Sequence, residues 1–480
     1  MSQGIFIDGA WHASAGERFD VVCPSTEQVI GQAGEATAVE VDAAVSAARQ
    51  SFSTGPWRRL DVTDRAAVID AAATGLAARK AELARLITSE MGAPLAMSTA
   101  TVDRAVDTMR SIADLARTTS LEELRRHGAP ALVVREPIGV VAAIAPWNGP
   151  IGMAVGKIVP ALLAGCSVVF KPAPETPLDV AILVDALREA GVPAGVLNVV
   201  TGRAATGKAL VEHAGVDKVS FTGSTSAGRY IGSVCGSQFK RTQLELGGKS
   251  AAIVLDDADL EQVRAGLSVG CFMNSGQACV ALSRVLAPRR LYDEVVALLG
   301  KAADAWQIGD PFAAETTMGP LVSAAQRERV ESYMQLGVDA GATLVRGGGR
   351  PPGLSTGWYV EPTVFADVDN SMRIAREEIF GPVAVVIPYD DVDEAVAIAN
   401  DSEYGLHGAV FSTNPTRALD VARSVRTGTF SLNNFVYNNR VPFGGVKDSG
   451  IGREGGLEGF LSYFELKTIN LDAAAEQLLQ

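Results

Sequence analysis

The chain has 480 residues, 47% of them hydrophobic and 20% charged, and a formal charge of −13 at neutral pH. This length and apolar content predict two or three globular domains with large cores. The acidic balance argues against a nucleic-acid partner, because a phosphate backbone requires a basic face.

The start of the chain, MSQGIFIDGAW, lacks the basic segment and apolar core of a signal peptide, and no apolar run reaches the roughly 20 residues that span a bilayer. We therefore expect a cytoplasmic protein without a membrane partner. The five cysteines are odd in number and contain no CxxC pair, which argues against a disulfide framework and against a metal site. They are Cys23, Cys166, Cys235, Cys271 and Cys279.

Residues 38–118 are mostly helical by pattern, with a break at TSEMGAP (88–94). The segment 121–139 then forms two extended arms around a Gly-Ala-Pro turn, and we expect this excursion to pair with another subunit. Four apolar strands follow, each succeeded by a helical run, which is the pattern of parallel βαβ units in a doubly wound sheet. They are VVAAIAPW (140–147), SVVFKP (167–172), VLNVVTG (196–202) and KVSFTG (218–223).

A second α/β series begins after residue 250. Its expected strands are AAIVLDD, VAVVIPYD, GAVFST and GTFSLNN, and the helix-prone DLEQVRAGLSVGCFM follows the first of them. The alternation predicts a second α/β domain.

Two features of the first series suggest a nucleotide site. The turn FTGSTSAG (221–228) opens a helix at Gly223 and Ser224, where free backbone N–H groups favour an anion, although glycines at such a turn often serve geometry alone. Lys171 ends an adjacent apolar strand at the sheet edge where open α/β folds bind ligands. Together, the two features favour a dinucleotide.

Cys279, in NSGQAC, is the candidate nucleophile because small and polar residues precede it. Cys166, Cys235 and Cys271 stand among apolar or small residues and are expected to be inert core residues. None of the four histidines lies near it in sequence. Glu245, between an apolar strand and two glycines, is the next candidate for a base, and a solvated strand-end glutamate is the alternative reading of this residue.

Seven motifs, in order and spacing, resemble those of the aldehyde dehydrogenase superfamily over nearly the whole chain. They are PWN (146–148), FKPAPETP (170–177), FTGSTSAG (221–228), LELGGK (244–249), NSGQAC (274–279), EEIFGPV (377–383) and PFGGVKDSGIGRE (442–454). The resemblance implies that Cys279 attacks an aldehyde carbonyl, while the Asn148 side chain and the Cys279 N–H hold the oxyanion. Glu245 would activate the water that hydrolyses the thioester, and Lys157 matches a lysine near this base.

The resemblance also implies NAD as cofactor, with NADP as the alternative, and a small-molecule aldehyde as substrate. The expected cofactor-binding residues are Trp147, Lys171, Glu175, Gly223, Ser224, Gly247, Glu378 and Phe380. Lys171 and Glu378 would bind ribose hydroxyls, Phe380 would pack near the nicotinamide, and the helix after Ser224 would take the pyrophosphate. Many NAD-preferring relatives have an acidic residue three positions after the lysine, where this chain has Pro174 and the carboxylate is displaced to Glu175.

The fold implied by the family is a Rossmann-like cofactor domain (1–118 and 138–247), an α/β catalytic domain (248–450) and a small β oligomerisation element (119–137 and 451–480). Homodimers or homotetramers are expected. In that setting LSYFELKTIN (461–470) is an edge strand that completes a neighbour's sheet.

The substrate pocket implied by the family alignment contains two glycines and therefore predicts a bulky hydrophobic or aromatic aldehyde. Its expected lining is Gly149, Met153, Gly156, Met273, Val280 and Tyr437. Arg440 leaves a semialdehyde as an alternative, because its guanidinium suits a carboxylate tail. Three other readings stay open: a CoA-acylating aldehyde dehydrogenase, a cofactor-independent thiol acyl hydrolase using Cys279, and a catalytically silent protein of the same fold.

Overall fold

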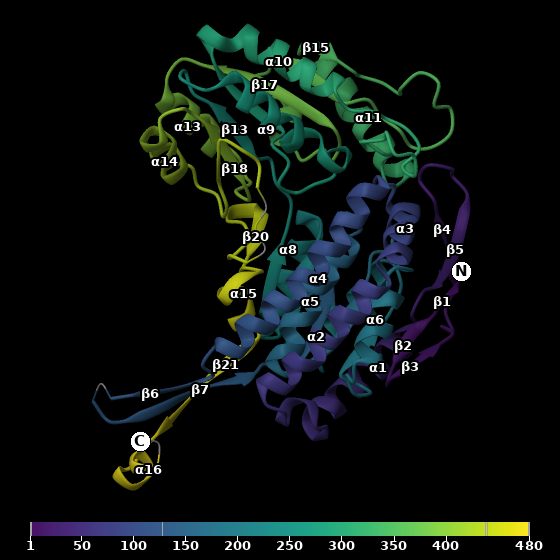
Figure 1. The fold of residues 1–480 in the computed structure, drawn as a ribbon, viewed down its shortest axis with the longest axis vertical. Helices are drawn as coiled ribbons and strands as arrows, with labels where there is room; N and C mark the ends of the chain where they lie inside the picture. Colours follow the sequence, from purple (N-terminus) through teal and green to yellow (C-terminus); the bar gives the residue numbers. More distant parts are fainter. Residues whose placement is uncertain (1, 127, 437, 439, 479–480) are drawn as a thin grey trace.

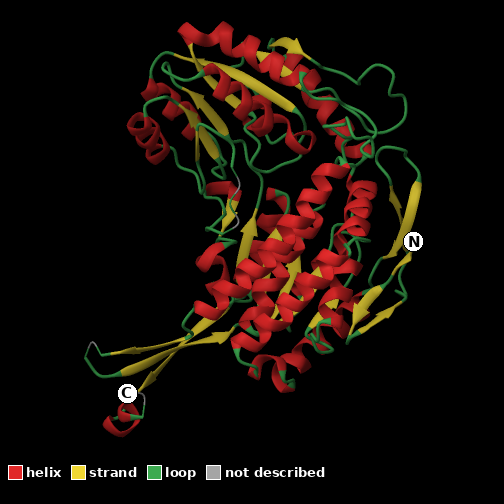
Figure 2. Ribbon diagram, viewed as in Figure 1, coloured by secondary structure: helices red, strands yellow, loops and turns green. Residues whose placement is uncertain are grey.

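A computed structural model describes residues 2–126, 128–436, 438 and 440–478. Figure 1 shows two α/β bodies, one made mainly of the purple to teal part of the chain and the other of the green to yellow part, with a β arm that extends from the first body. In Figure 2, helices flank the strands of both bodies. The α/β fold class expected from the sequence is confirmed.

The first body contains an eight-stranded sheet with the order β20-β12-β11-β8-β9-β10-β2-β3. Strands β8 to β12 run parallel to their neighbours within this group, whereas β2, β3 and β20 are antiparallel. The four predicted strands of the first series are present as β8 to β11. The bounds are β2 Ile5–Ile7, β3 Ala10–His12, β8 Val140–Ile144, β9 Ser167–Lys171, β10 Leu197–Val199, β11 Lys218–Thr222, β12 Arg241–Glu245 and β20 Gly450–Ile451.

The order of the strands reverses beside β8, with β9 and β10 on one side and β11 and β12 on the other. In open parallel sheets the loops that leave the carboxyl ends at such a reversal form the ligand crevice. The loops after β8 and β11 carry Asn148 and Ser224, so the predicted catalytic and cofactor motifs meet at this edge.

Helices cover both faces of this sheet, and the strands accordingly have apolar side chains on both sides. Val141 and Ala143 pack into the core with α2 to α6, whereas Val140 and Ala142 pack into the core with α1, α7 and α8. The bounds are α1 Ala38–Thr54, α2 Val62–Ala78, α3 Lys80–Met91, α4 Leu95–Thr118, α5 Pro150–Ala164, α6 Val180–Glu189, α7 Ala204–Glu212, α8 Thr225–Ser237 and α15 Gly456–Leu461. Gly92, with φ +84, separates α3 from α4 at the predicted break.

The second body contains a seven-stranded sheet with the order β15-β16-β17-β14-β13-β18-β19, parallel except for β15. Its strands are β13 Ala251–Val254, β14 Arg284–Pro288, β15 Thr343–Arg346, β16 Thr363–Ala366, β17 Val383–Tyr389, β18 Gly408–Phe411 and β19 Ser431–Leu432. Its helices are α9 Leu260–Phe272, α10 Tyr292–Asp304, α11 Ala324–Asp339, α12 Arg373–Arg376, α13 Val392–Asn400 and α14 Pro415–Ser424.

The arm is a three-stranded antiparallel sheet with the order β21-β7-β6. Its strands are β6 Glu122–Arg125, β7 Ala131–Pro137 and β21 Phe464–Asn470, and α16 Ala473–Gln477 follows. The two arms predicted in segment 121–139 are therefore present, whereas the predicted C-terminal strand begins at Phe464 and not at 461, because helix α15 extends to Leu461. A further small sheet contains β1 Ser2–Gln3, β4 Arg18–Val22 and β5 Val29–Gly34.

In the part of the chain that the structure describes, no helix combines the length and apolar composition needed to cross a bilayer. The domain boundaries and the cytoplasmic location expected from the sequence stay predictions.

Candidate active site

The loop that carries Cys279 has an unusual backbone. It begins where α9 ends, and Asn274, Ser275 and Gly276 in succession adopt positive φ values of 56°, 56° and 68°. Non-glycine residues seldom adopt this conformation, and their presence here indicates that surrounding contacts hold the loop. One such contact runs from Ser275 Oγ to the Gly319 carbonyl oxygen (2.8 Å), and another from the Val322 N–H to Gln277 Oε1 (3.0 Å).

Cys279 is half-buried at the end of this loop. Burial, followed by the charges of Glu378 and Glu245, raises the pKa of its thiol to about 12. The thiol is therefore protonated at neutral pH and requires a base to become a nucleophile. Gly248 packs against the same segment, because a Cβ at this position would lie 2.2 Å from the Cys279 carbonyl oxygen.

Asn148 reaches the same loop from the end of β8. Its side-chain Nδ2 donates to the Gln277 carbonyl oxygen (3.0 Å), and its backbone carbonyl accepts from Asn274 Nδ2 (3.0 Å). The structure therefore brings the Asn148 amide and the Cys279 loop together, as the sequence predicted.

Glu245 ends β12 and is 2% exposed. Neither carboxylate oxygen has a hydrogen-bond partner in the described structure. Burial, followed by the charge of Glu454, raises the pKa of this carboxyl well above its usual value, and Lys157 and Arg453 act in the opposite direction. A carboxylate whose pKa is raised is a stronger base than an exposed glutamate, which suits it to accept a proton.

Lys157, on α5, forms a buried ion pair with Glu454 and lies 3.4 Å from Ser220 Oγ. The sequence analysis placed Lys157 near the base but did not single out Glu454. A signal for Glu454 was present in the sequence, because it ends the motif PFGGVKDSGIGRE, but its contact with α5 depends on the fold. Lys249 was also missed: it is fully buried, its amine has no partner among the described residues, and burial lowers its pKa to about 7.

Glu378 lies beside Gly247, and Phe380, two residues later, packs against Trp147. The Gly248 N–H donates to Glu378 Oε1 (2.9 Å), and a Cβ at Gly247 would lie 2.6 Å from Glu378 Oε2, so only glycine allows this approach. The rings of Trp147 and Phe380 meet edge to face with centroids 5.3 Å apart. Burial raises the pKa of Glu378 to about 7.

Lys171 is buried at the end of β9, where its Nζ donates to the Pro172 carbonyl oxygen (3.1 Å). Burial lowers the pKa of this amine to about 8, although the nearby charges of Glu175 and Glu35 oppose the shift. An ammonium group has three donors, so Lys171 can also bind a ligand hydroxyl. Burial raises the pKa of Glu175 itself.

The start of α8 offers a site for an anion. Ser224 caps this 13-residue helix by accepting the Ala227 N–H (3.3 Å), and the preceding Gly223 completes the turn after β11. Free N–H groups and the helix dipole favour a phosphate here. With Lys171 after β9 and Glu378 beside Gly247, these groups suit a dinucleotide with an anionic centre and hydroxyl-bearing ends.

The expected pocket residues on α5 share one half-buried face of the helix. Gly149, Met153 and Gly156 lie on it together with Gly152, which the sequence analysis did not name. No atom lies within 4 Å of a Cβ built at Gly152 or Gly156, so the face is open.

On the side of the expected pocket away from α5, the structure describes only some of the predicted residues. Met273 and Val280 are half-buried on either side of the nucleophile loop. Val280 lines a cavity of about 310 Å³, and the other described residues of its wall include His407 and residues from 429–436 and 441–443. Tyr437 lies outside the described residues, and Arg440 is exposed.

The aldehyde dehydrogenase family model matches residues 11–469. The chain is 46% identical over 473 residues to a geranial dehydrogenase of Castellaniella defragrans, covering 98% of both chains. It is 42% identical over 470 residues to a 3-succinoylsemialdehyde-pyridine dehydrogenase of a Pseudomonas species, covering 97% of both. A Mycobacterium tuberculosis aldehyde dehydrogenase solved with NAD⁺ superposes with a TM-score of 0.95 at 44% identity, over 98% of this chain and 99% of that one. The chain therefore belongs to the aldehyde dehydrogenase family and is an NAD(P)-dependent aldehyde dehydrogenase.

Proposed function

We propose that this enzyme oxidises a bulky, mainly apolar aldehyde to a carboxylic acid, with NAD⁺ as cofactor and a covalent intermediate on Cys279. The observation that carries the proposal is the buried Glu245 carboxylate, whose two oxygens lack a partner and whose charge acts on the Cys279 thiol. An unpartnered buried carboxylate beside a protonated thiol is unfavourable for stability, so a role in proton transfer accounts for it.

The first step is attack by sulfur. Glu245 accepts the thiol proton, and the Cys279 thiolate adds to the aldehyde carbonyl to form a thiohemiacetal. Asn148 Nδ2 and the Cys279 N–H donate hydrogen bonds to the resulting oxyanion, and the hydrogen bond that Asn148 makes to the Gln277 carbonyl holds its amide near the loop.

NAD⁺, when bound, supplies the two-electron acceptor that brings the substrate to the oxidation level of an acid. Glu378 and Lys171 are the residues proposed to bind its ribose hydroxyls. The start of α8 would hold its pyrophosphate, and the Trp147–Phe380 pair would border its nicotinamide. The acyl group then remains on Cys279 as a thioester.

Hydrolysis releases the acid. After Glu245 has released the thiol proton to solvent, it takes a proton from water, which attacks the thioester while the Asn148 amide again holds the oxyanion. The C–S bond then breaks, and the Cys279 thiolate leaves and takes up a proton. Because Lys157 and Glu454 act on the Glu245 pKa in opposite directions, their ion pair tunes the base.

The preference for NAD⁺ over NADP⁺ is supported by charge. Glu175 and Glu35 both act on the Lys171 amine, so two carboxylates adjoin the residue proposed to bind the ribose. Their charges disfavour a 2′-phosphate, whereas Arg203, which pairs with Glu35, acts in the opposite direction. Glu175 thus supplies, one position later, the carboxylate that many NAD-preferring relatives have at the position of Pro174.

The preference for a bulky aldehyde is supported by the open α5 face at Gly152 and Gly156, since each methylene buried there contributes about 0.8 kcal/mol. The similarity to a geranial dehydrogenase is consistent with this preference. A semialdehyde is the second candidate, favoured by the relative named 3-succinoylsemialdehyde-pyridine dehydrogenase, and Arg440 is the residue that would bind its carboxylate. The unpartnered Glu245 disfavours a CoA-acylating reaction, and the Lys171 and Glu378 sites disfavour a cofactor-independent hydrolase.

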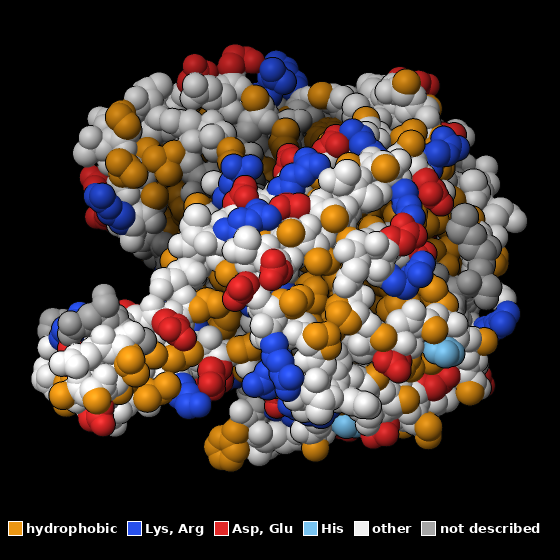
Figure 3. Space-filling view, turned by 60° about the horizontal axis from the view of Figure 1, so that its bottom comes forward, with side chains coloured by type: hydrophobic (Ala, Val, Ile, Leu, Met, Phe, Trp, Pro, Cys, Tyr) orange, Lys and Arg blue, Asp and Glu red, His pale blue; other side chains and the backbone are white. Residues whose placement is uncertain are grey.

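A homodimer or homotetramer is proposed from the arm. Strand β21 is an edge strand, and Leu466 (66% exposed) and Ile469 (40% exposed) lie on it. In Figure 3, apolar side chains gather on the protruding arm. Such an edge favours pairing with a second copy.

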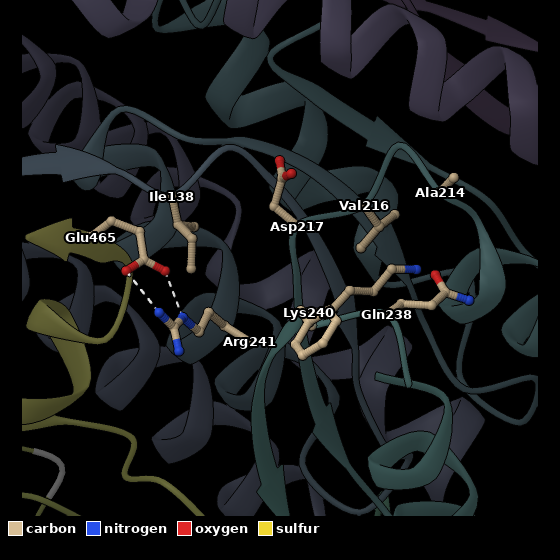
Figure 4. Close-up of a pocket in the computed structure, with 9 residues that line it drawn as sticks. Ile138, Ala214, Val216, Asp217, Gln238, Lys240, Arg241 and Glu465 are labelled. Atoms are coloured by element: carbon tan, nitrogen blue, oxygen red, sulfur yellow. Dashed lines mark hydrogen bonds and ion pairs between the residues drawn. The ribbon is translucent and has the colours of Figure 1, made fainter. Parts of the chain in front are cut away.

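A cavity of about 510 Å³ lies at the base of β21 and supports the same proposal. Figure 4 shows Arg241 and Glu465 forming a two-hydrogen-bond ion pair at one end of it. Phe239, in the same wall, is 95% exposed and has φ +57, which is a combination that a partner's surface would stabilise.

The experiment that tests the function measures NAD⁺ and NADP⁺ reduction across acetaldehyde, octanal, geranial, benzaldehyde and succinic semialdehyde. The proposal predicts NAD⁺ reduction, with kcat/KM rising from acetaldehyde to the bulky aldehydes. A preference for acetaldehyde or for succinic semialdehyde would contradict the substrate class.

A further inference from the structure

Val280, the residue after the nucleophile, lines a cavity whose wall has both apolar and polar side chains. Val280, Phe435 and Phe443 give it an apolar surface, while His407 and Ser431 bring polar groups to it. A substrate tail that extends from Cys279 toward Val280 would meet these groups. The polar groups therefore bear on which tails the enzyme accepts.

His407 is fixed in this wall. It precedes β18, is 4% exposed, and meets the Phe435 ring edge to face with centroids 5.5 Å apart. Its neighbour Leu406 adjoins the nucleophile loop, because a Cβ at Gly248 would lie 3.4 Å from Leu406 Cβ and 2.2 Å from the Cys279 carbonyl oxygen. The segment that carries His407 therefore packs close to the backbone of Cys279.

His407 is held through Nδ1. The Thr429 hydroxyl lies 2.9 Å from Nδ1 and 3.1 Å from the Leu406 carbonyl oxygen, which also accepts the Thr429 N–H (3.0 Å). Because a neutral imidazole has one donor and one acceptor nitrogen and a hydroxyl group can do both, Nε2 can bond to a hydroxyl in either tautomer. Burial lowers the pKa of His407 to about 4, which keeps the ring neutral.

Nε2 is weakly satisfied. Its partner, Ser431 Oγ, is 3.5 Å away, at the long limit for a hydrogen bond. The same Ser431 oxygen accepts the Val436 N–H at 3.4 Å, which is also long. A ligand hydroxyl beside the two groups could bond to both at shorter distances.

We propose that His407 and Ser431 bind a hydroxyl group on the substrate's tail, so that the enzyme favours aldehydes whose apolar ring or chain carries a hydroxyl away from the carbonyl. The inference rests on the proposed function and names the substrate class more closely. A carboxylate tail is disfavoured in this cavity, because a neutral imidazole offers it no positive charge. A methyl group in place of the hydroxyl leaves Nε2 without a good partner.

The test compares aldehydes that differ only in this group. The pairs are 4-hydroxybenzaldehyde with 4-methylbenzaldehyde, and 9-hydroxynonanal with decanal. The hydroxyl group lies closer to the carbonyl in the first pair and farther from it in the second. The quantity is the ratio of kcat/KM for the hydroxyl member to that for the methyl member. His407→Phe keeps a ring against Phe435 and removes the ring nitrogens, and Ser431→Ala removes the hydroxyl.

His407→Phe is expected to lower the ratio by about 10-fold in at least one pair, the usual scale for one hydrogen bond, and Ser431→Ala to lower it in the same pair. The control His213→Gln alters a histidine that bonds Asp42, far along the chain, and should leave the ratio unchanged. If His407→Phe does not fold, Ser431→Ala decides: a fall in the ratio supports the proposal and an unchanged ratio contradicts it.

An unchanged ratio in both pairs for folded His407→Phe overturns this inference alone, provided that the wild type oxidises the aldehydes. A wild-type protein that binds NAD⁺ but oxidises none of the aldehydes overturns the proposed function instead.

Discussion

Lys157 and Glu454 form an ion pair in the protein interior although 297 positions separate them in the chain. The side chain of Lys157 is fully buried and that of Glu454 is 11% exposed. Both charges act on Glu245, Glu454 raising the pKa of that carboxyl and Lys157 lowering it. The pair therefore offers a direct way to test the base.

Glu454→Gln should move the pH dependence of kcat to lower pH. The variant removes a negative charge near Glu245 and leaves Lys157 unneutralised, and both changes lower the pKa of the base. Because Glu245 must be unprotonated to act, activity is lost as pH falls through its pKa, and the loss then occurs at lower pH. The measurement is kcat between pH 5 and 9.

Lys157→Met is the complementary variant. Removing the positive charge raises the pKa of Glu245, so the loss of kcat on the acidic side of the pH profile should move to higher pH. Shifts of the two variants in one direction would be inconsistent with electrostatic tuning of Glu245.

Glu245→Gln should slow acylation, because water must then take the thiol proton that Glu245 is proposed to accept, and it should stop hydrolysis. Rapid mixing with NAD⁺ and an aldehyde should give a burst of NADH, slower than the first turnover of the wild type, followed by very slow turnover, because the amide cannot activate water. Steady-state rates equal to those of the wild type would exclude this residue as the base.

The strands of the first body illustrate what the sequence determines. Strands buried on both faces have continuous apolar runs, so the runs at 140–147 and 167–172 predicted β8 and β9. The segment GTFSLNN predicted a longer strand than the structure contains. Its strand β19 covers only Ser431–Leu432, because Asn433 adopts a left-handed conformation with φ +57.

The sequence could predict a residue of the proposed site only where that residue stands in a recognisable motif. Cys279, Glu245 and Asn148 stand in motifs that name them, and the fold brings their segments together. The contacts of Glu454 with Lys157 and of His407 with Ser431 join different motifs. They depend on three-dimensional packing, which spacing along one chain does not specify.

Asn148→Ala should lower kcat by about 100-fold or more with a smaller effect on KM, the usual scale for one oxyanion donor. The control Asn414→Ala removes the same amide from the N-cap of α14 and should affect stability without changing kcat. An effect of Asn148→Ala confined to KM would assign this amide to binding alone.

Gly156→Trp should reverse the order of substrates. No atom lies within 4 Å of a Cβ at Gly156, so the indole can enter the open face of α5 and occupy the space of a bulky tail. Activity on octanal and geranial should fall well below that on acetaldehyde, measured as kcat/KM. A variant that still prefers the bulky aldehydes would show that the substrate tail lies elsewhere.

The central claim is the covalent acyl intermediate on Cys279, and mass spectrometry of Glu245→Gln tests it most directly. After mixing with NAD⁺ and octanal, the peptide that contains Cys279 should gain the mass of an octanoyl group. The double variant that also carries Cys279→Ala should gain none and should produce no NADH, while its fold and cofactor binding persist. An octanoyl group on another residue, or NADH formation without Cys279, would contradict the mechanism.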